Sequence, residues 1–146
     1  MTIYLATDHA GFELKEVIKE MLVRDGRSVN DMGAYSFDAS DDYNDFVVRV
    51  ALRVQQDSDS RGVIFGGSGQ GEAMQANRLK GVRAAVFYGG NVDIVRLSRE
   101  HNNANILSIG ARFVDEQQAK DAVRQWLEIP FTDEERHDRR NKKLDA

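Results

Sequence analysis

Cysteine is absent from the 146 residues of this chain, and proline occurs once. The lack of cysteine excludes disulfide bonds, a catalytic thiolate, and zinc or iron–sulfur sites with cysteine ligands. No apolar run approaches the ~20 residues that a membrane-spanning helix needs. The chain reaches Asp8 without the basic start and long apolar stretch of a signal peptide. These absences predict a cytoplasmic protein with no membrane partner.

The chain has the size and composition of one globular unit. Its 146 residues predict a single domain, residues 1–146, with one buried core. The formal net charge of −4 disfavours nucleic acid as the main partner. Basic residues nevertheless gather near the carboxyl terminus, where they can hold a small anion.

Short apolar runs alternate with amphipathic stretches along the whole chain. Leu14, Val17, Ile18, Met21 and Leu22, for example, have the spacing of a helix with one buried face. Strands are expected at about 3–6, 28–32, 63–65, 82–88 and 106–109, and helices at about 14–22, 47–54, 72–79, 94–101, 119–127 and 133–144. This alternation predicts an α/β, three-layer Rossmann-like fold with a five-stranded parallel sheet and an extra C-terminal helix.

Ligands of such sheets gather at the carboxyl ends of the strands. Four segments are expected there, namely 7–9, 66–71, 88–90 and 110–112. The segment 66–71 reads Gly-Gly-Ser-Gly-Gln-Gly and lies between a predicted strand and a predicted helix. Glycines there allow either a tight turn or a loop whose amide groups face an anion.

Two nucleotide-binding motifs fit this loop poorly. The dinucleotide fingerprint Gly-x-Gly-x-x-Gly fails, because the third glycine position counted from Gly67 is Glu72. A P-loop requires Gly-Lys followed by Ser or Thr, and the chain has no such triplet.

Glu72 is the carboxylate that follows the glycine loop. In the first turn of a helix it has two interpretations, a residue that stabilises the helix dipole or a base beside an oxyanion site. Its place after amide groups at a strand end favours the base. The helix dipole is expected to keep it ionised and therefore ready to accept a proton.

The histidines and the C-terminal arginines also have two interpretations each. His101 fits a helix end or a core position, and Asp8 fits a helix cap. The three histidines lack the tight spacing of metal ligands, which disfavours a metal site. Arg136 and Arg140 are four residues apart on a predicted helix, so they form either a solvated face or a phosphate clamp.

Several long motifs together resemble one family, the type B ribose-5-phosphate isomerases, which also includes galactose-6-phosphate isomerase subunits. The matching segments are Asp8 to Lys15, Gly66 to Glu72 with Ala76-Asn77, Arg99 to Ala104, Gly110 to Arg112 and Arg136 to Arg140. They occur in the family's order and cover essentially the whole chain.

The resemblance implies an aldose–ketose isomerisation through a cis-enediolate, without a cofactor or a metal. The family has two branches. One uses a cysteine base at the position of Gly66, and the other uses a glutamate in the helix after the loop. Because this chain lacks cysteine, the resemblance assigns it to the glutamate branch, with Glu72 as the base.

The resemblance also implies the other site residues. Ser68 and the amides of the loop stabilise the enediolate oxygen, His101 opens the sugar ring, and Asp8 binds sugar hydroxyls. Residues implied to bind substrate are His9, Tyr43, Gly67, Gly69, Gln70, Gly71, Asn102, Arg112, Arg136 and Arg140. In the family, the segment with His101 and Asn102 comes from a second subunit, so a homodimer with shared sites, or a tetramer, is expected.

The sequence leaves alternatives for both the substrate and the class of function. Ribose 5-phosphate is the expected aldose. The same chemistry on a tetrose 4-phosphate, allose 6-phosphate or galactose 6-phosphate is the alternative. A phosphosugar sensor without catalysis is a third hypothesis, and Asp8, Glu72, His101 and Arg112 together disfavour it, because a sensor needs no base.

Overall fold

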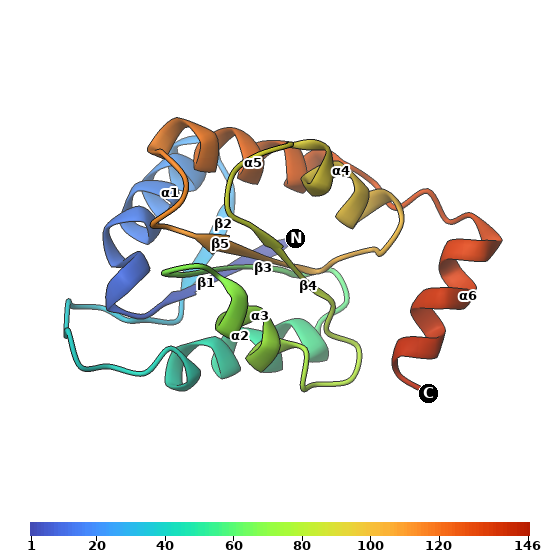
Figure 1. The fold of residues 1–146 in the computed structure, drawn as a ribbon, viewed down its shortest axis with the longest axis horizontal. Coiled ribbons are helices and arrows are strands. Elements are labelled where there is room, and N and C mark those ends of the chain that lie inside the picture. Colours follow the sequence, from blue (N-terminus) through green and yellow to red (C-terminus); the bar gives the residue numbers. More distant parts are fainter.

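The computed structural model describes residues 1–146 as a five-stranded parallel sheet with helices on both faces (Figure 1). The strand order across the sheet is β2-β1-β3-β5-β4. The strands are β1 (Thr2–Thr7), β2 (Ser28–Asp31), β3 (Arg61–Gly66), β4 (Ala84–Phe87) and β5 (Ile106–Gly110). The helices are α1 (Phe12–Arg24), α2 (Asn44–Gln56), α3 (Gln70–Ala76), α4 (Asp93–Glu100), α5 (Glu116–Glu128) and α6 (Glu135–Leu144), with a short 3₁₀ turn at His9–Gly11.

Two apolar layers hold the helices to the sheet. On one face α1, α4 and α5 pack over the strands, and Trp126 of α5 is completely buried there. On the other face α2 and α3 cover the sheet through residues such as Val47 and Ala76. Figure 1 shows these two layers above and below the sheet. The predicted three-layer α/β fold is therefore confirmed.

The order of the predicted elements agrees with the structure, whereas several ends differ. Helix α3 begins at Gln70, two residues before the predicted start, because Gly69 with φ of +78° turns the chain directly into the helix. The fourth strand covers only Ala84–Phe87. Helix α6 begins at Glu135, since Asp133 has φ of +55°, outside the helical region.

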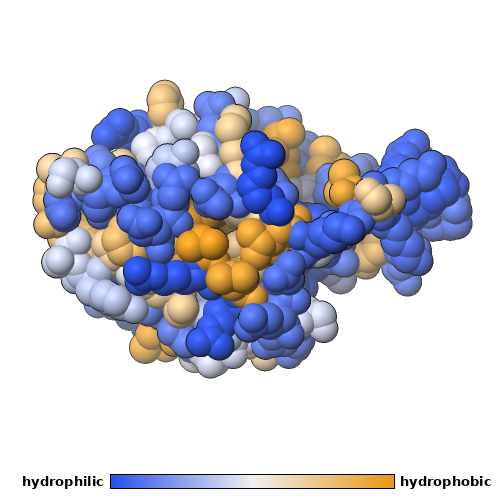
Figure 2. Space-filling view, turned by 90° about the horizontal axis from the view of Figure 1, so that it is seen from below, coloured by the Kyte–Doolittle hydropathy of each residue, from blue (hydrophilic) through white to orange (hydrophobic).

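Helix α6 lies apart from the two layers. It extends from the side of the molecule where strands begin, opposite the edge where they end (Figure 1). In the space-filling view it protrudes beyond the body, and an apolar patch lies in the middle of the same face (Figure 2). None of the helices is both long and apolar enough to cross a membrane.

Candidate active site

Three loops meet at the carboxyl edge of the sheet. They follow the adjacent strands β1, β3 and β5 and carry Asp8, the glycine loop and Arg112. Backbone hydrogen bonds join the last two loops, since the amide of Ala111 donates to the Gly66 carbonyl at 2.8 Å and that of Arg112 to the Gly67 carbonyl at 3.1 Å. The parallel sheet therefore brings these sequence-distant segments together, as predicted.

Neighbouring side chains pack closely against the glycines of the loop and leave no room for larger residues. A Cβ atom at Gly69 would lie 3.1 Å from the Ser108 Oγ, whose hydroxyl donates to the Gly69 carbonyl at 2.6 Å. A Cβ atom at Gly71 would lie 2.6 Å from the Tyr43 hydroxyl. Tyr43 therefore packs directly against the start of α3.

This loop offers unpaired hydrogen-bond donors. The amide of Gln70 donates to the Ser68 Oγ at 3.3 Å, and the Gln70 side chain is exposed. The amides of Gly69 and Gly71 donate to no acceptor within the chain. Backbone amides without partners at the start of a helix can stabilise a developing oxyanion.

Glu72 lies within this loop structure rather than on the surface. Its side chain is buried, and its Oε1 lies 1.8 Å from the place where a Cβ atom of residue 66 would be. Only glycine at position 66 leaves room for the carboxylate. The side chain of Glu72 thus reaches back from α3 to the end of β3.

Burial raises the pKa of Glu72, and the nearby Asp8 carboxylate raises it further, whereas the residue's own backbone amide lowers it. This upward direction is opposite to the effect that was expected of the helix dipole. A raised pKa makes Glu72 a stronger base than an exposed glutamate.

Asp8 and His9 follow the end of β1, and the Asp8 carboxylate lies near Glu72. Asp8 accepts a hydrogen bond from the amide of Ala10 at 2.9 Å, so it caps the 3₁₀ turn, and its side chain is buried. His9 forms a 2.7 Å hydrogen bond from its Nδ1 to the Oδ1 of Asp41, and this bond raises the pKa of His9.

Asp41 is a site residue that sequence reasoning missed. It lies in the loop before α2, a segment with no periodic pattern and several acidic residues. Ligand atoms of Asp8, His9 and Asp41 lie within 4.8 Å of one another, a grouping that can hold a metal ion. The His9 Nδ1 and the Asp41 Oδ1 are, however, hydrogen-bonded to each other, so these two atoms already satisfy one another.

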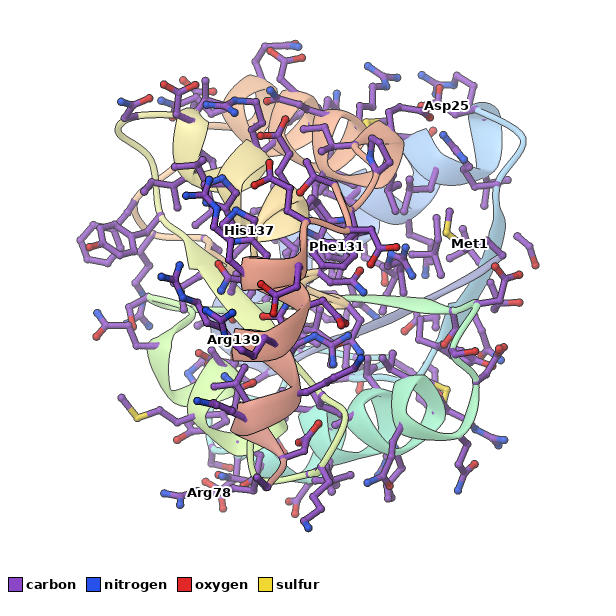
Figure 3. All side chains as sticks on the ribbon, turned by 90° about the vertical axis from the view of Figure 1, so that its right-hand side faces the viewer. Met1, Asp25, Arg78, Phe131, His137 and Arg139 are labelled. Carbon is purple, nitrogen blue, oxygen red and sulfur yellow. The ribbon has the colours of Figure 1, made fainter.

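The remaining predicted residues form a second group, at the amino edge of the sheet. His101 follows α4, and its ring stacks on that of His137 with the centroids 4.1 Å apart. His137 and Arg139 are labelled on α6 in Figure 3. Asn102 is exposed, and its carbonyl accepts from Arg83.

The two predicted C-terminal arginines lie on the exposed part of α6. The Arg136 Nε donates to Glu134 at 3.1 Å, whereas Arg140 has no carboxylate partner. The guanidinium of Arg140 is therefore available to an anion.

The structure separates the predicted residues into two half-sites. The carboxyl-edge half-site consists of Asp8, His9, Tyr43, Ser68, Glu72 and Arg112, and the amino-edge half-site of His101, Asn102, Arg136 and Arg140. Strand β5 starts after Asn105 and ends at Gly110, paired with Gly66. Its five residues span about 13 Å. Glu72 and His101 of one chain therefore lie at opposite ends of the sheet.

Comparison with known proteins gives a consistent result. The sequence model of the Ribose/Galactose Isomerase family matches residues 3–144. The chain is 42% identical over 140 residues to the ribose-5-phosphate isomerase B of Mycolicibacterium paratuberculosis, covering 96% of this chain and 87% of that protein.

Solved structures agree with this match. The ribose-5-phosphate isomerase B of Mycoplasma genitalium with bound ribulose 5-phosphate superposes with a TM-score of 0.93 at 39% identity, covering 98% of this chain and 93% of that one. The corresponding protein of Thermotoga maritima gives a TM-score of 0.92 at 40% identity, with 99% and 97% covered.

Proposed function

The chain belongs to the Ribose/Galactose Isomerase family, and from this membership we propose that it interconverts ribose 5-phosphate and ribulose 5-phosphate with Glu72 as the base. One observation carries the assignment of the base. The buried Glu72 carboxylate fills the space above Gly66 at the end of β3, beside the loop with unpaired amides. A base and an oxyanion site are thus adjacent.

The proposed reaction moves one proton between neighbouring carbons. Glu72 takes the proton from C2 of the open-chain aldose, and the electron pair forms the enediolate. The hydroxyl proton on O2 passes to O1, and the same carboxylic acid returns the carbon-bound proton to C1, which leaves a hydroxyl on C1 and the ketose carbonyl at C2. The raised pKa of Glu72 supports this role, because a base works best when its pKa approaches the working pH.

Stabilisation of the enediolate falls to the glycine loop. The donors that the loop offers just before Glu72 are the unpaired amides of Gly69 and Gly71 and the hydroxyl of Ser68. One well-placed donor contributes about 3–4 kcal/mol to stabilising such an oxyanion. Proton transfer and hydrogen bonding by the chain's own groups account for the chemistry without a cofactor.

The other residues bind the sugar and open its ring. His101 acts as the acid–base group at the ring oxygen, and Asp8 and Asn102 hold hydroxyl groups. Cationic side chains at the far end of the substrate bind its phosphate, namely His9, Arg112, Arg136 and Arg140. Binding energy from the phosphate then helps to position the reacting carbons.

A second copy of the chain completes the site. His101 and Glu72 cannot both reach one five-carbon sugar within a single chain, because β5 separates them. A homodimer that places the amino-edge half-site of one subunit on the carboxyl-edge half-site of its partner resolves this separation. The edge strand β4 supports such contact, since Ala84 and Val86 line a groove with Ala73 and Met74 of α3. The polar residues Gln70, Asn77 and Arg78 complete its lining.

Substrate choice is tested by comparing kcat/KM for four-, five- and six-carbon aldose phosphates on purified protein. We expect ribose 5-phosphate to be preferred. A hundredfold preference for another sugar phosphate would leave the proposed reaction unchanged and identify that sugar as the substrate. If NMR shows that the protein binds phosphosugars but interconverts none of them, the protein is instead a sensor.

A further inference from the structure

Asp41 makes two hydrogen bonds to a single residue, His9. The same carboxylate oxygen, Oδ1, accepts from the His9 amide at 2.9 Å and bonds the His9 Nδ1 at 2.7 Å. The ring and the backbone of His9 are therefore both tied to one atom. The Asp41 side chain is only 9% exposed, and its other oxygen, Oδ2, is buried without a partner. A rigid carboxylate of this kind fixes the orientation of the imidazole.

The second ring nitrogen of His9 remains free. Its Nε2 makes no hydrogen bond within the chain, and the side chain is 28% exposed. With Nδ1 bonded to a carboxylate, Nε2 is the only ring atom available to a ligand. Phe37 packs edge-on against the ring with the centroids 6.2 Å apart, which further limits its movement.

Charges of both signs surround His9. Asp8, Asp38 and Asp41 lie on the acidic side, and the Arg112 guanidinium lies on the basic side. The hydrogen bond to Asp41 is the largest influence and raises the pKa of His9, burial and Arg112 lower it, and the net direction is upward. The imidazolium form is therefore more favoured in the folded protein than in an unperturbed histidine.

We propose that Asp41 is a positioning residue that holds His9 as a fixed cation, so that its Nε2–H donates to the phosphate group of the substrate and favours the dianion. This inference rests on the proposed function, because it assigns the phosphate to the carboxyl-edge half-site. Charge-assisted hydrogen bonds to phosphate are about twice as strong as neutral ones. Asp41 thereby adjusts substrate affinity without contacting the substrate.

Two variants separate charge from position. Asp41→Asn keeps an oxygen that can accept from His9 and removes the negative charge, whereas Asp41→Ala removes both. Asp45→Asn is the matched control, because Asp45 is an exposed acid on the first turn of α2 without an ion pair. The side-chain nitrogens of His9 are followed by ¹H–¹⁵N NMR over pH 5–9 in the free protein, without substrate.

In the unchanged protein we expect His9 to titrate above its ordinary pKa of 6.5. Asp41→Asn should move the midpoint downward, and Asp45→Asn should leave it in place. An unchanged His9 titration in Asp41→Asn overturns the proposal. A titration that depends on added Mg²⁺ or Zn²⁺ or on EDTA also overturns it, since Asp8, His9 and Asp41 would then hold a cation. Because no turnover is measured, failure here is distinct from failure of the isomerase assignment.

Kinetics supply a second readout. At pH 8, Asp41→Asn should raise KM for ribose 5-phosphate by about tenfold with little change in kcat, the scale of one weakened charged hydrogen bond. At pH 6, where a larger share of His9 is protonated in both proteins than at pH 8, the KM ratio should be closer to one. Asp41→Ala should raise KM at both pH values. Comparison at equal pH cancels the ionisation of the substrate itself. A fall in kcat with unchanged KM contradicts the proposal.

Discussion

The Glu72 Oε1 lies 1.8 Å from the position that a Cβ atom of residue 66 would occupy. The carboxylate from α3 and a side chain at the end of β3 therefore compete for one space. In this chain glycine leaves that space to Glu72.

Gly66→Ala should push Glu72 out of this space. We expect kcat to fall by on the order of 100-fold or more, because a misplaced base loses its alignment with the reacting carbon. Gly81→Ala serves as the control, since no atom lies within 4 Å of its Cβ and only its φ of +79° opposes alanine. The control should lower the melting temperature and leave kcat unchanged. Equal kcat in both variants would contradict the shared space.

Glu72→Gln should remove turnover and stabilise the fold. Burial raises the pKa of Glu72, so the folded state binds the proton more tightly than the unfolded state. Stability is therefore lost as pH rises from the unfolded pKa of ~4.5 through the higher folded value, and the loss persists at pH 7.

Melting temperatures of the two proteins at pH 4 and pH 8 test this linkage. The variant should melt higher at pH 8, by roughly 2–4 °C for each kcal/mol recovered, and the difference should shrink at pH 4. A lower melting temperature for the variant at pH 8 contradicts a destabilising, buried carboxylate.

Arg99 supports the segment that carries His101 and Asn102. Its buried guanidinium donates to the carbonyls of Ala104 and Ile129, and burial lowers the pKa of Arg99 to about 10, so it stays charged at neutral pH. Arg99→Leu leaves these carbonyls without donors, at a cost on the order of 2–4 kcal/mol.

The Arg99→Leu variant should have a lower melting temperature and a higher KM than Arg96→Leu. Arg96 lies on the same helix, and its partner Glu100 forms a partly exposed pair worth at most about 0.5 kcal/mol. Similar losses in both variants would show that Arg99 has no special supporting role.

The shared site predicts complementation between two inactive variants. Glu72→Gln and His101→Asn should each be inactive alone. After mixing and subunit exchange, about half of the dimers are mixed and hold one intact site of two, so about a quarter of the wild-type activity should return. Activity that stays absent after confirmed subunit exchange would contradict a site formed by two chains.

Periodicity and chain order were sufficient to predict the fold and one edge of the site. Apolar strands such as 63–65 and the helical spacing from Leu14 onward predict the parallel sheet, and the sheet alone brings Asp8, Glu72 and Arg112 together. The sequence also suggests that Arg136 and Arg140 share a face. These predictions use only local spacing and the direction of the strands.

Other features depend on contacts that no local pattern encodes. Asp41 lies in an irregular loop, and its importance comes from a hydrogen bond to His9, 32 positions earlier. The pKa of Glu72 is raised because the folded loop buries its carboxylate. The position of Glu72 on the helix does not predict this direction. The paired strands β3 and β5 place His101 and Glu72 at opposite edges of the sheet.

Exchange of substrate hydrogen with solvent tests the central claim, Glu72 as the base, most directly. Ribose 5-phosphate is incubated in D₂O with the unchanged protein and with Glu72→Gln, and deuterium incorporation into the sugar phosphates is followed by NMR beside isomerisation. We predict that the unchanged protein isomerises the sugar and incorporates deuterium through the enediolate. Glu72→Gln should bind the sugar phosphate with similar affinity and do neither. Isomerisation and exchange at near-normal rates in Glu72→Gln would contradict the account.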